Sequence, residues 1–255
     1  MIANYHTHTW RCNHATGSEE SYVQAALDRG LSILGFSDHT PYGFPDGYRS
    51  HIRMTMDQLP EYCDVVRTLQ KQYAGKIEIP LGLELEYYPD CLPDLLPILQ
   101  DHGVEYLLLG QHFLGNEAGQ PYSGHATEDV SILERYCRQS MDAMQTGLFT
   151  YFAHPDLIHF TGDDKRYRSN LRRLCQEAKG CGLPLEINVL GLWSGRHYPD
   201  LRFWELAAEE GCSVVIGCDA HAPEHLKRMD AEERAMEIVN RYGLRLLETV
   251  TLRKI

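Results

Sequence analysis

Several apolar, strand-like runs of this chain end in residues that commonly bind metal ions. The residues at these ends are His6 and His8, Asp38 and His39, Glu84 and Glu86, His112, His154, and Asp219 and His221. Imidazole and carboxylate groups together suit zinc, manganese and ferrous iron, without need of cysteine. If the apolar runs are parallel strands of a barrel, their carboxyl ends meet at one mouth. The pattern therefore predicts a metal site there.

Two motifs have a spacing that places two ligand-type side chains on the same face of the chain. In His6-Thr7-His8 the imidazoles alternate with one residue, so on a strand they share a face and could chelate one ion. Taken alone, this motif could equally be a pair of solvent-facing histidines. His14 follows in the next turn, where it could reach a neighbouring ion. Asp219-Ala220-His221 likewise places an oxygen ligand and a nitrogen ligand on one face.

Glu84 lies between Leu83 and Leu85, so its carboxylate is expected to be buried. A buried carboxylate is costly unless a charged or hydrogen-bonding partner stabilises it. Such a group can bridge two metal ions. Glu86 shares the same face and is the weaker candidate. His112 and His154 each end an apolar run, and either one alone would more often be a core histidine than a ligand.

Composition limits the classes of function. The chain has 255 residues and a formal net charge of −12, which disfavours a general nucleic-acid binder. Its eight cysteines are scattered without a C-x-x-C pair, and no apolar stretch resembles a signal peptide or a membrane span. We therefore expect a cytoplasmic protein with reduced thiols.

Strand-like and helix-like segments alternate along residues 1–255, which predicts one α/β domain. Expected strands cover residues 2–5, 31–37, 78–85, 104–110, 148–153, 183–189 and 213–218. Expected helices cover residues 18–30, 57–73, 92–102, 128–146, 169–181, 201–210 and 223–242. Residues 41–48 and 160–168 are expected to be long loops over the mouth. About seven β/α units favour a TIM-like barrel with the site at the carboxyl ends of its strands. An open doubly wound sheet is the alternative, but it would collect ligands only near its switch point.

The ordered motifs make the chain resemble the PHP (polymerase and histidinol phosphatase) superfamily over essentially its whole length. The motifs are His6-Thr7-His8, Ser37-Asp38-His39, Gly82-Leu83-Glu84, Gln111-His112, Ala153-His154-Pro155-Asp156 and Cys218-Asp219-Ala220-His221. The resemblance implies a distorted (β/α)7 barrel with three divalent ions, which could be zinc, manganese or iron. It assigns His6, His8, Glu84 and Asp219 to the first ion. It assigns Glu84, His112 and His154 to the second, and His14, His39 and His221 to the third.

The predicted chemistry is phosphomonoester hydrolysis by a hydroxide that bridges two ions. Asp219, His221 and Glu84 are the catalytic candidates, and either Asp219 or a solvent molecule could protonate the leaving group. Arg196, His197, Arg166 and Arg11 are the candidates for substrate binding. Each arginine has an alternative role: a surface charge for Arg196, a solvated charge run for Arg166, and a bond to a nearby carboxylate for Arg11.

The compact form most resembles the stand-alone histidinol-phosphate phosphatases, so L-histidinol phosphate in histidine biosynthesis is the first-choice substrate. Asp46, Tyr42, Phe44 and Tyr48 are the candidates for recognising its imidazole alcohol. The expected partners are this small phosphomonoester and inorganic phosphate, with no membrane and no nucleic acid, while the oligomeric state stays open. The alternatives are hydrolysis of a nucleotide 3′,5′-bisphosphate or an oligonucleotide end, and a noncatalytic metal-binding accessory domain.

Overall fold

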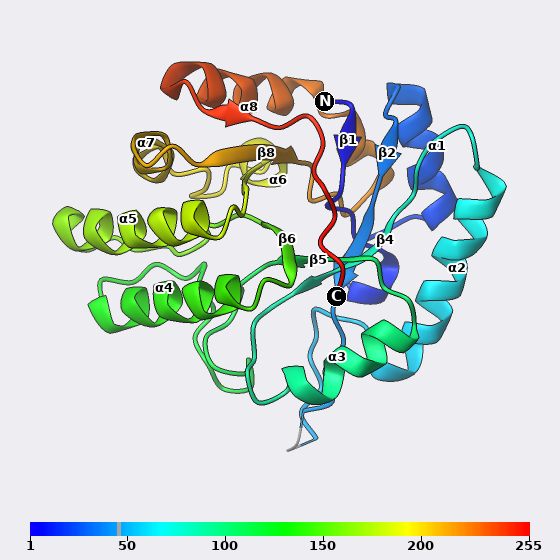
Figure 1. Cartoon of the computed structure of the whole chain (residues 1–255), viewed down its shortest axis with the longest axis horizontal. Helices are drawn as coiled ribbons and strands as arrows, with labels where there is room; N and C mark the ends of the chain where they lie inside the picture. Colours follow the sequence, from blue (N-terminus) through cyan, green and yellow to red (C-terminus); the bar gives the residue numbers. More distant parts are fainter. Residues whose placement is uncertain (45–46) are drawn as a thin grey trace.

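Parallel strands form the wall of a barrel, with helices packed around it (Figure 1). The computed structural model describes residues 1–44 and 47–255. Strands β3 to β9 pair side by side in chain order, and β1 pairs with β2 in a separate short ladder. All of these pairs are parallel. The strands are β1 (Ala3–Asn4), β2 (Ile33–Leu34), β3 (Phe36–His39), β4 (Leu81–Leu85), β5 (Tyr106–Leu109), β6 (Phe149–Phe152), β7 (Leu185–Asn188), β8 (Ser213–Gly217) and β9 (Arg245–Leu246).

Backbone hydrogen bonds close the barrel at its mouth. The amide of Ala220, just after β8, donates to the carbonyl of His6 (3.1 Å), and the amide of His8 donates to the carbonyl of Ala220 (2.9 Å). At the other end of this seam, β8 pairs with β9 through Ser213 and Arg245. The first and last barrel strands therefore meet only near the mouth. This confirms the predicted distorted barrel rather than the open sheet.

The described residues form eight α-helices. They are α1 (Glu19–Arg29), α2 (Leu59–Gln72), α3 (Leu92–Asp101), α4 (Val130–Gln145), α5 (Asp164–Gly180), α6 (Val189–Trp193), α7 (Leu201–Glu209) and α8 (Met229–Tyr242). They cover the outside of the barrel except for the short α6, whose Leu190 and Trp193 line a cavity at the mouth (Figure 1). Helix α1 is capped at both ends, because the Ser18 side chain accepts the amide of Ser21 and Gly30 ends the helix at φ +83°. Within the described residues, no helix is long and apolar enough to cross a membrane.

Two apolar layers stabilise the fold, one outside and one inside the barrel wall. Along β5, Leu107 and Leu109 belong to the outer core beneath the helices, whereas Tyr106 and Leu108 belong to the inner cluster. This alternation follows from the two-residue period of a strand. The inner cluster contains Ala3, Tyr5, Tyr106, Leu108, Tyr151, Ala153 and Val215. The polar mouth therefore lies above an apolar barrel interior.

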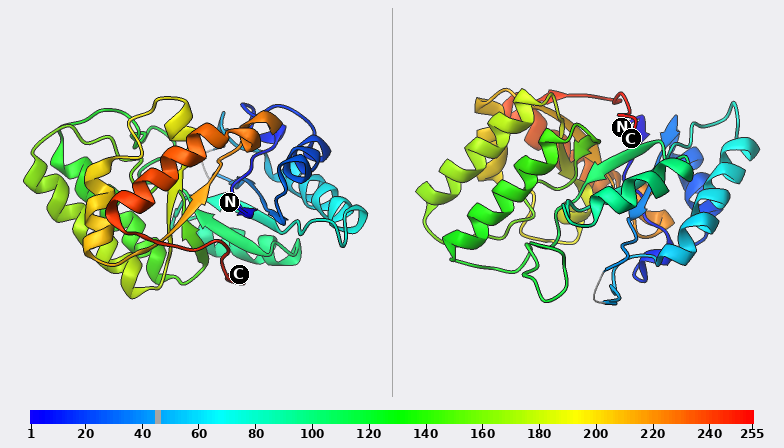
Figure 2. Two further views of the ribbon diagram at one scale, coloured as in Figure 1. Left: turned by 90° about the horizontal axis from the view of Figure 1, so that it is seen from above. Right: turned by 60° about the horizontal axis from the view of Figure 1, so that its bottom comes forward.

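The C-terminal segment covers the end of the barrel away from the long loops (Figure 2). Leu247, Val250 and Leu252 pack against the inner cluster. The amide of Leu247 donates to the carbonyl of Val214 at 2.8 Å. Because the C-terminal segment covers this end, the mouth at the carboxyl ends of the strands is the open end of the barrel.

Several element boundaries differ from the expected ones. Residues 31–37 form two strands separated at Gly35, where the Tyr106 hydroxyl packs against the backbone and donates to the carbonyls of Tyr5 (2.7 Å) and Phe36 (3.1 Å). Residues 164–168, expected in a loop, begin α5, because the Asp163 side chain caps that helix. Residues 223–242 are divided into a 3-10 helix, Pro223–Lys227, and α8. Strand β9 and helix α6 were not predicted.

Candidate metal centre

Glu84, on β4, lies at the centre of a group of histidines from four other parts of the wall. Its Oε1 is 2.9 Å from Nε2 of His154, 3.6 Å from Nε2 of His6 and 3.7 Å from Nε2 of His112. Its Oε2 is 3.0 Å from Nδ1 of His39 and 3.6 Å from Nε2 of His8. The side chain of Glu84 is fully buried. One carboxylate thus faces five imidazoles, an arrangement that suits a group shared between ions.

Asp219 forms a second meeting point beside Glu84. Its Oδ1 is 3.1 Å from Nε2 of His8 and 3.5 Å from Nε2 of His6. The two Nε2 atoms of His6 and His8 are themselves 3.2 Å apart. Facing imidazole nitrogens at this distance need either a proton or a cation between them. The structure therefore brings together the H-x-H pair and the aspartate.

A third group lies at the rim of the mouth. Nε2 of His14 is 3.0 Å from Nε2 of His221, and His39 lies close to both. His14 is exposed and His221 half-buried. Their Nδ1 atoms bond to backbone carbonyls, His14 to Cys12 at 2.7 Å and His221 to Asp219 at 3.0 Å. Backbone carbonyls accept hydrogen bonds, so each Nε2 is left unprotonated and available as a ligand.

Buried carboxylates orient the inner histidines. Nδ1 of His6 is 2.9 Å from Oε1 of Glu186 on β7, and Nδ1 of His112 is 2.9 Å from Oε1 of Glu86. Such a carboxylate accepts the Nδ1 proton and leaves Nε2 facing the site. Glu86 is in turn held by two hydrogen bonds from Arg53, at 2.8 and 2.9 Å. The Nδ1 atoms of His6 and His112 are therefore fixed by carboxylate side chains.

The charges of the site agree with a cation-binding role. Burial opposes ionisation of Glu84, but His112, His6 and His39 hold its pKa well below the usual range. Asp219 behaves in the same way, because the charge of His6 and a hydrogen bond from His8 lower its pKa against the effect of burial. Burial, together with the charge of His8, lowers the pKa of His39 to about 3. The carboxylates are thus ionised and His39 is neutral, the states that bind metals. Burial opposes protonation of His8, but Asp219 and Asp38 raise its pKa to about 9, so an ion that binds there must displace a proton.

Unusual backbone conformations position two of the candidate ligands. His154 has φ +33° and Asp219 has φ +50°, although neither is glycine. Such conformations are uncommon for non-glycine residues and cost of order 1–3 kcal/mol each, and they often occur at functional sites. Both residues follow the end of a strand, where this turn directs the side chain into the mouth.

The donor set fits divalent ions. His6, His8 and Asp219 have ligand atoms within 4.8 Å of one another, as do His6, Glu84 and His154, and His14, His39 and His221. Nδ1 of His39 and Oε2 of Glu84 are 3.0 Å apart but are not aligned for a hydrogen bond, and neither has another partner among the described residues. Buried polar atoms without partners are costly, and a cation between them would remove that cost.

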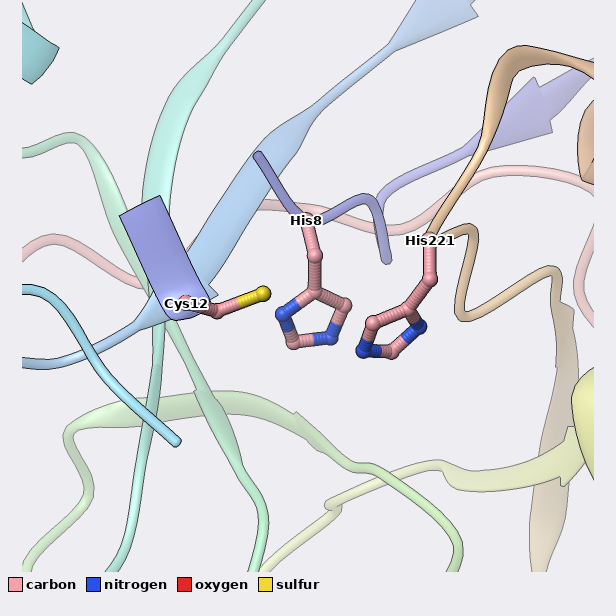
Figure 3. A group of neighbouring side chains, drawn as sticks. All are labelled: His8, Cys12 and His221. Atoms are coloured by element: carbon pink, nitrogen blue, oxygen red, sulfur yellow. The ribbon is translucent and has the colours of Figure 1, made fainter. Parts of the chain in front are cut away.

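Cys12 lies against the same histidines. Its thiol points toward the ring of His8, with His221 on the other side of that ring (Figure 3). Burial and the nearby Asp38 carboxylate raise the pKa of this thiol. A protonated thiol is a poor metal ligand. The histidines and carboxylates therefore remain the better ligand set, as their types alone predicted.

A cavity of about 380 Å³ opens beside the histidines. Its walls include Arg196, Tyr198, Tyr122 and Trp193 in addition to candidate metal ligands. Nη1 of Arg196 donates to the Tyr198 hydroxyl at 2.8 Å. Burial raises the pKa of Tyr198, so its hydroxyl is protonated near neutral pH. Arg196 is thus the one predicted substrate-binding residue that lines this cavity in the described part of the chain.

The other three predicted substrate-binding residues lie elsewhere. Arg11 is buried and forms ion pairs with Glu19 and Glu61. It therefore has the alternative role named above, a bond to nearby carboxylates. Arg166 is exposed in the first turn of α5 and does not line the cavity. Nε2 of His197 donates to the Leu157 carbonyl at 2.7 Å, and its ring stacks on that of His159 with centroids 4.0 Å apart.

The aromatic residues expected to recognise the alcohol also lie away from this cavity. Tyr42 and Phe44 are buried, and the Tyr42 hydroxyl donates to the carbonyl of Glu86. The Tyr48 hydroxyl donates to Glu117 at 3.2 Å. Asp46 lies outside the described residues. The described members of this loop therefore pack in or against the outer core and do not line the cavity.

Sequence reasoning gave no role to Glu186, Arg53, Tyr122 or Tyr198. Glu186 carries the same signal as Glu84, a carboxylate inside an apolar strand, and could have been found. Arg53 and the two tyrosines come from loops, where no periodic pattern fixes the direction of a side chain.

Comparisons with known proteins agree with this geometry. The chain is 33% identical to a probable histidinol-phosphatase of Deinococcus radiodurans over 229 residues, which cover 87% of each chain. It is 23% identical to a histidinol-phosphatase of Bacillus subtilis, over 85% of this chain and 92% of the relative. A histidinol phosphate phosphatase from Lactococcus lactis, solved with zinc, L-histidinol and phosphate, has the same fold. The TM-score is 0.78 at 19% identity, with 100% of this chain and 98% of that chain covered.

The comparison with family models gives the assignment. The model described as PHP domain matches residues 4–189, which include most of the candidate ligands. With its relatives and its clustered histidines and carboxylates, the protein is a histidinol-phosphatase-like, metal-dependent phosphatase. The chain belongs to the PHP domain family.

Proposed function

We propose that this protein hydrolyses L-histidinol phosphate to L-histidinol and inorganic phosphate, a reaction of histidine biosynthesis. The observation that carries the proposal is the convergence of histidines and carboxylates on Glu84 beside a cavity containing Arg196. The likeness to histidinol-phosphatases, at 33% identity for the relative from Deinococcus radiodurans, supports the choice of substrate.

We propose three ions, as the motifs imply. His6, His8, Glu84 and Asp219 would hold the first ion, and Glu84, His112 and His154 the second. His14, His39 and His221 would hold the third. Zinc, manganese and iron all suit these donors, and the zinc of the Lactococcus lactis enzyme supports zinc as one of them.

The residues divide the chemistry between the metal centre and the cavity wall. Bound divalent ions would activate water and neutralise the charge that develops on the phosphoryl group. Glu86 and Glu186 hold His112 and His6 in the orientation that binding requires. Arg196 offers a planar fork of N–H donors, which suits two phosphate oxygens. The mouth can thus orient a phosphomonoester with its alcohol toward the cavity.

The test is phosphate release from L-histidinol phosphate, compared with sugar, nucleotide and aryl phosphates. Manganese, zinc or iron would be restored after chelation. We expect kcat/KM of roughly 10⁴ M⁻¹s⁻¹ or more for L-histidinol phosphate and much less for the others. Turnover of a nucleotide bisphosphate without turnover of histidinol phosphate would overturn the proposed substrate assignment.

A pair of histidine variants tests whether the activity belongs to this site. His154→Gln should abolish turnover, whereas His51→Gln, at an exposed histidine outside the metal centre, should not. Activity that survives the first change would come from another site or a contaminant.

A further inference from the structure

Arg196 and Tyr198 form a hydrogen-bonded pair on the wall of the cavity. The guanidinium donates to the phenol oxygen at 2.8 Å, and its carbon lies 5.8 Å from the centre of the ring. Tyr198 is only 2% exposed, although it lines the cavity that also contains Asp219. Because the phenol oxygen accepts from Arg196, its own proton must point elsewhere. No described protein group accepts that proton.

The ring of Tyr198 is held by its neighbours. The His197 ring lies edge-on to it at 5.1 Å, and the ring of His154 lies 6.0 Å away on the metal side. Gly191 leaves the space that the ring occupies, since a Cβ there would be 2.7 Å from Cε2 of Tyr198. A phenol fixed in this way is a preorganised proton donor next to the place where a substrate would bind.

Hydrolysis of an alkyl phosphate needs such a donor. An alkoxide is a poor leaving group, because its conjugate acid is about as weak as water, whose pKa is about 15.7. Transfer of a proton to the leaving oxygen during bond breaking removes this difficulty and is typically worth 10²–10⁴-fold in rate. A nearby cation stabilises the group that gives up the proton.

We propose that Tyr198 is the catalytic acid of this enzyme, donating its hydroxyl proton to the leaving oxygen while Arg196 stabilises the phenolate. The proposal rests on the proposed phosphatase function. A water oxygen forms a bond to phosphorus, and the bond between phosphorus and the ester oxygen breaks. The electron pair stays on the ester oxygen, which takes the proton from Tyr198. The phenolate then regains a proton from solvent, so the net products are the alcohol and phosphate.

Tyr122 provides a matched comparison. It lines the same cavity, but no guanidinium among the described residues donates to its hydroxyl, since Arg196 donates to Tyr198. A tyrosine that only contacts the phosphoryl group should affect all phosphomonoesters alike, whatever their alcohol. A proton donor to the leaving oxygen should affect only those whose alcohol needs the proton.

The experiment measures kcat/KM of the metal-loaded wild type, Tyr198→Phe and Tyr122→Phe. The substrates are L-histidinol phosphate, an alkyl ester, and p-nitrophenyl phosphate, whose phenol leaves without a proton. We expect Tyr198→Phe to lose roughly 10²-fold or more on the alkyl ester and little on the aryl ester. Tyr122→Phe should change both by a similar factor. An equal loss on both esters in Tyr198→Phe would overturn the proposal.

A wild-type measurement covers the case in which Tyr198→Phe fails to fold. With a series of aryl phosphates of increasingly basic phenols, proton donation predicts a shallow dependence of kcat/KM on the basicity of the phenol. A steep dependence would overturn the role of Tyr198 and leave the phosphatase function intact. A wild type that hydrolyses neither L-histidinol phosphate nor any of these aryl esters would instead overturn the proposed function.

Discussion

The inner and outer parts of the metal centre orient their histidines by different means. The inner pair, His6 and His112, donate from Nδ1 to the buried carboxylates of Glu186 and Glu86. The outer pair, His14 and His221, bond from Nδ1 to backbone carbonyls near the solvent. Both kinds of partner orient the imidazole, but a charged carboxylate raises its basicity more than a neutral carbonyl does. We therefore expect the inner sites to bind ions more tightly than the rim site.

The largest effect should come from Glu84, the carboxylate shared across the inner region. Glu84→Gln keeps the shape of the side chain but removes the charge that faces five imidazoles. A loss of several kcal/mol, or at least about 10³-fold in kcat, is expected. Steady-state kinetics and metal analysis would check this. Glu134→Gln, a change of the same kind at an exposed position on α4, is the control. A near-normal kcat in the Glu84→Gln variant would contradict the role of Glu84 as a ligand shared between two ions.

An intermediate effect should follow removal of an orienting carboxylate. Glu186 accepts from His6, from the amide of His154 at 3.1 Å and from the Tyr151 hydroxyl at 3.3 Å. Glu186→Gln should weaken metal binding or activity by roughly 10–100-fold, because His6 loses its charged partner. Titration of the metal-free protein with zinc would measure the affinity. If the variant binds zinc as tightly as the wild type, the distinction between inner and outer histidines fails.

A smaller effect is expected at the rim. His14→Ala should lower the metal content by one equivalent while the inner ions stay bound. In the wild type, limited chelation should remove the same equivalent first, because His14 is exposed and its Nδ1 bonds to a backbone carbonyl, while Nδ1 of His221 lies nearer the Asp219 carbonyl (3.0 Å) than its carboxylate (3.3 Å). Metal analysis after graded exposure to a chelator would show the order of loss. Loss of an inner ion before the rim ion would show that the rim site binds its ion more tightly, contrary to our expectation.

The smallest of these expected effects is on the acid stability of the inner region. Burial opposes ionisation of Glu86, but the charge of Arg53 lowers its pKa to about 2. The unfolded chain, with an ordinary glutamate pKa of about 4.3, therefore binds this proton first as the pH falls. The stabilisation is present above about pH 4.3 and is lost as the pH falls toward 2. Denaturant unfolding of metal-free wild type and Glu86→Gln should differ most at neutral pH and converge in acid. A constant difference at every pH would contradict this assignment.

The sequence was most informative where strand periodicity fixes the direction of a side chain. His6 and His8, Glu84 and Asp219 follow or lie on buried strands, so a two-residue period was enough to bring them to one mouth. The barrel followed from the same alternation. The split between β2 and β3 could not be predicted, because the Tyr106 hydroxyl that packs against it comes from a distant strand.

The cavity wall was much harder to predict. Arg196 was found from its chemistry, but Arg11 has the same chemistry and instead pairs with Glu19 and Glu61. The choice between a phosphate and a carboxylate partner depends on helices that approach from elsewhere in the chain. The aromatic loop at residues 41–48 was misleading for a similar reason, since composition does not tell a packed ring from a substrate contact.

Two glycines limit which substitutions this site tolerates as strongly as its candidate metal ligands do. A Cβ on Gly110 would overlap the carboxylate of Glu84, and a Cβ on Gly217 would overlap that of Glu186. Gly110 directly follows β5, beside the strand of Glu84, and Gly217 ends β8, beside the strand of Glu186, so each glycine leaves the space that the acid fills. Even an alanine there would displace the acid and the histidines that depend on it. Evolution of a new specificity on this barrel is thus confined to the loops, while these two glycines should change as rarely as the histidines.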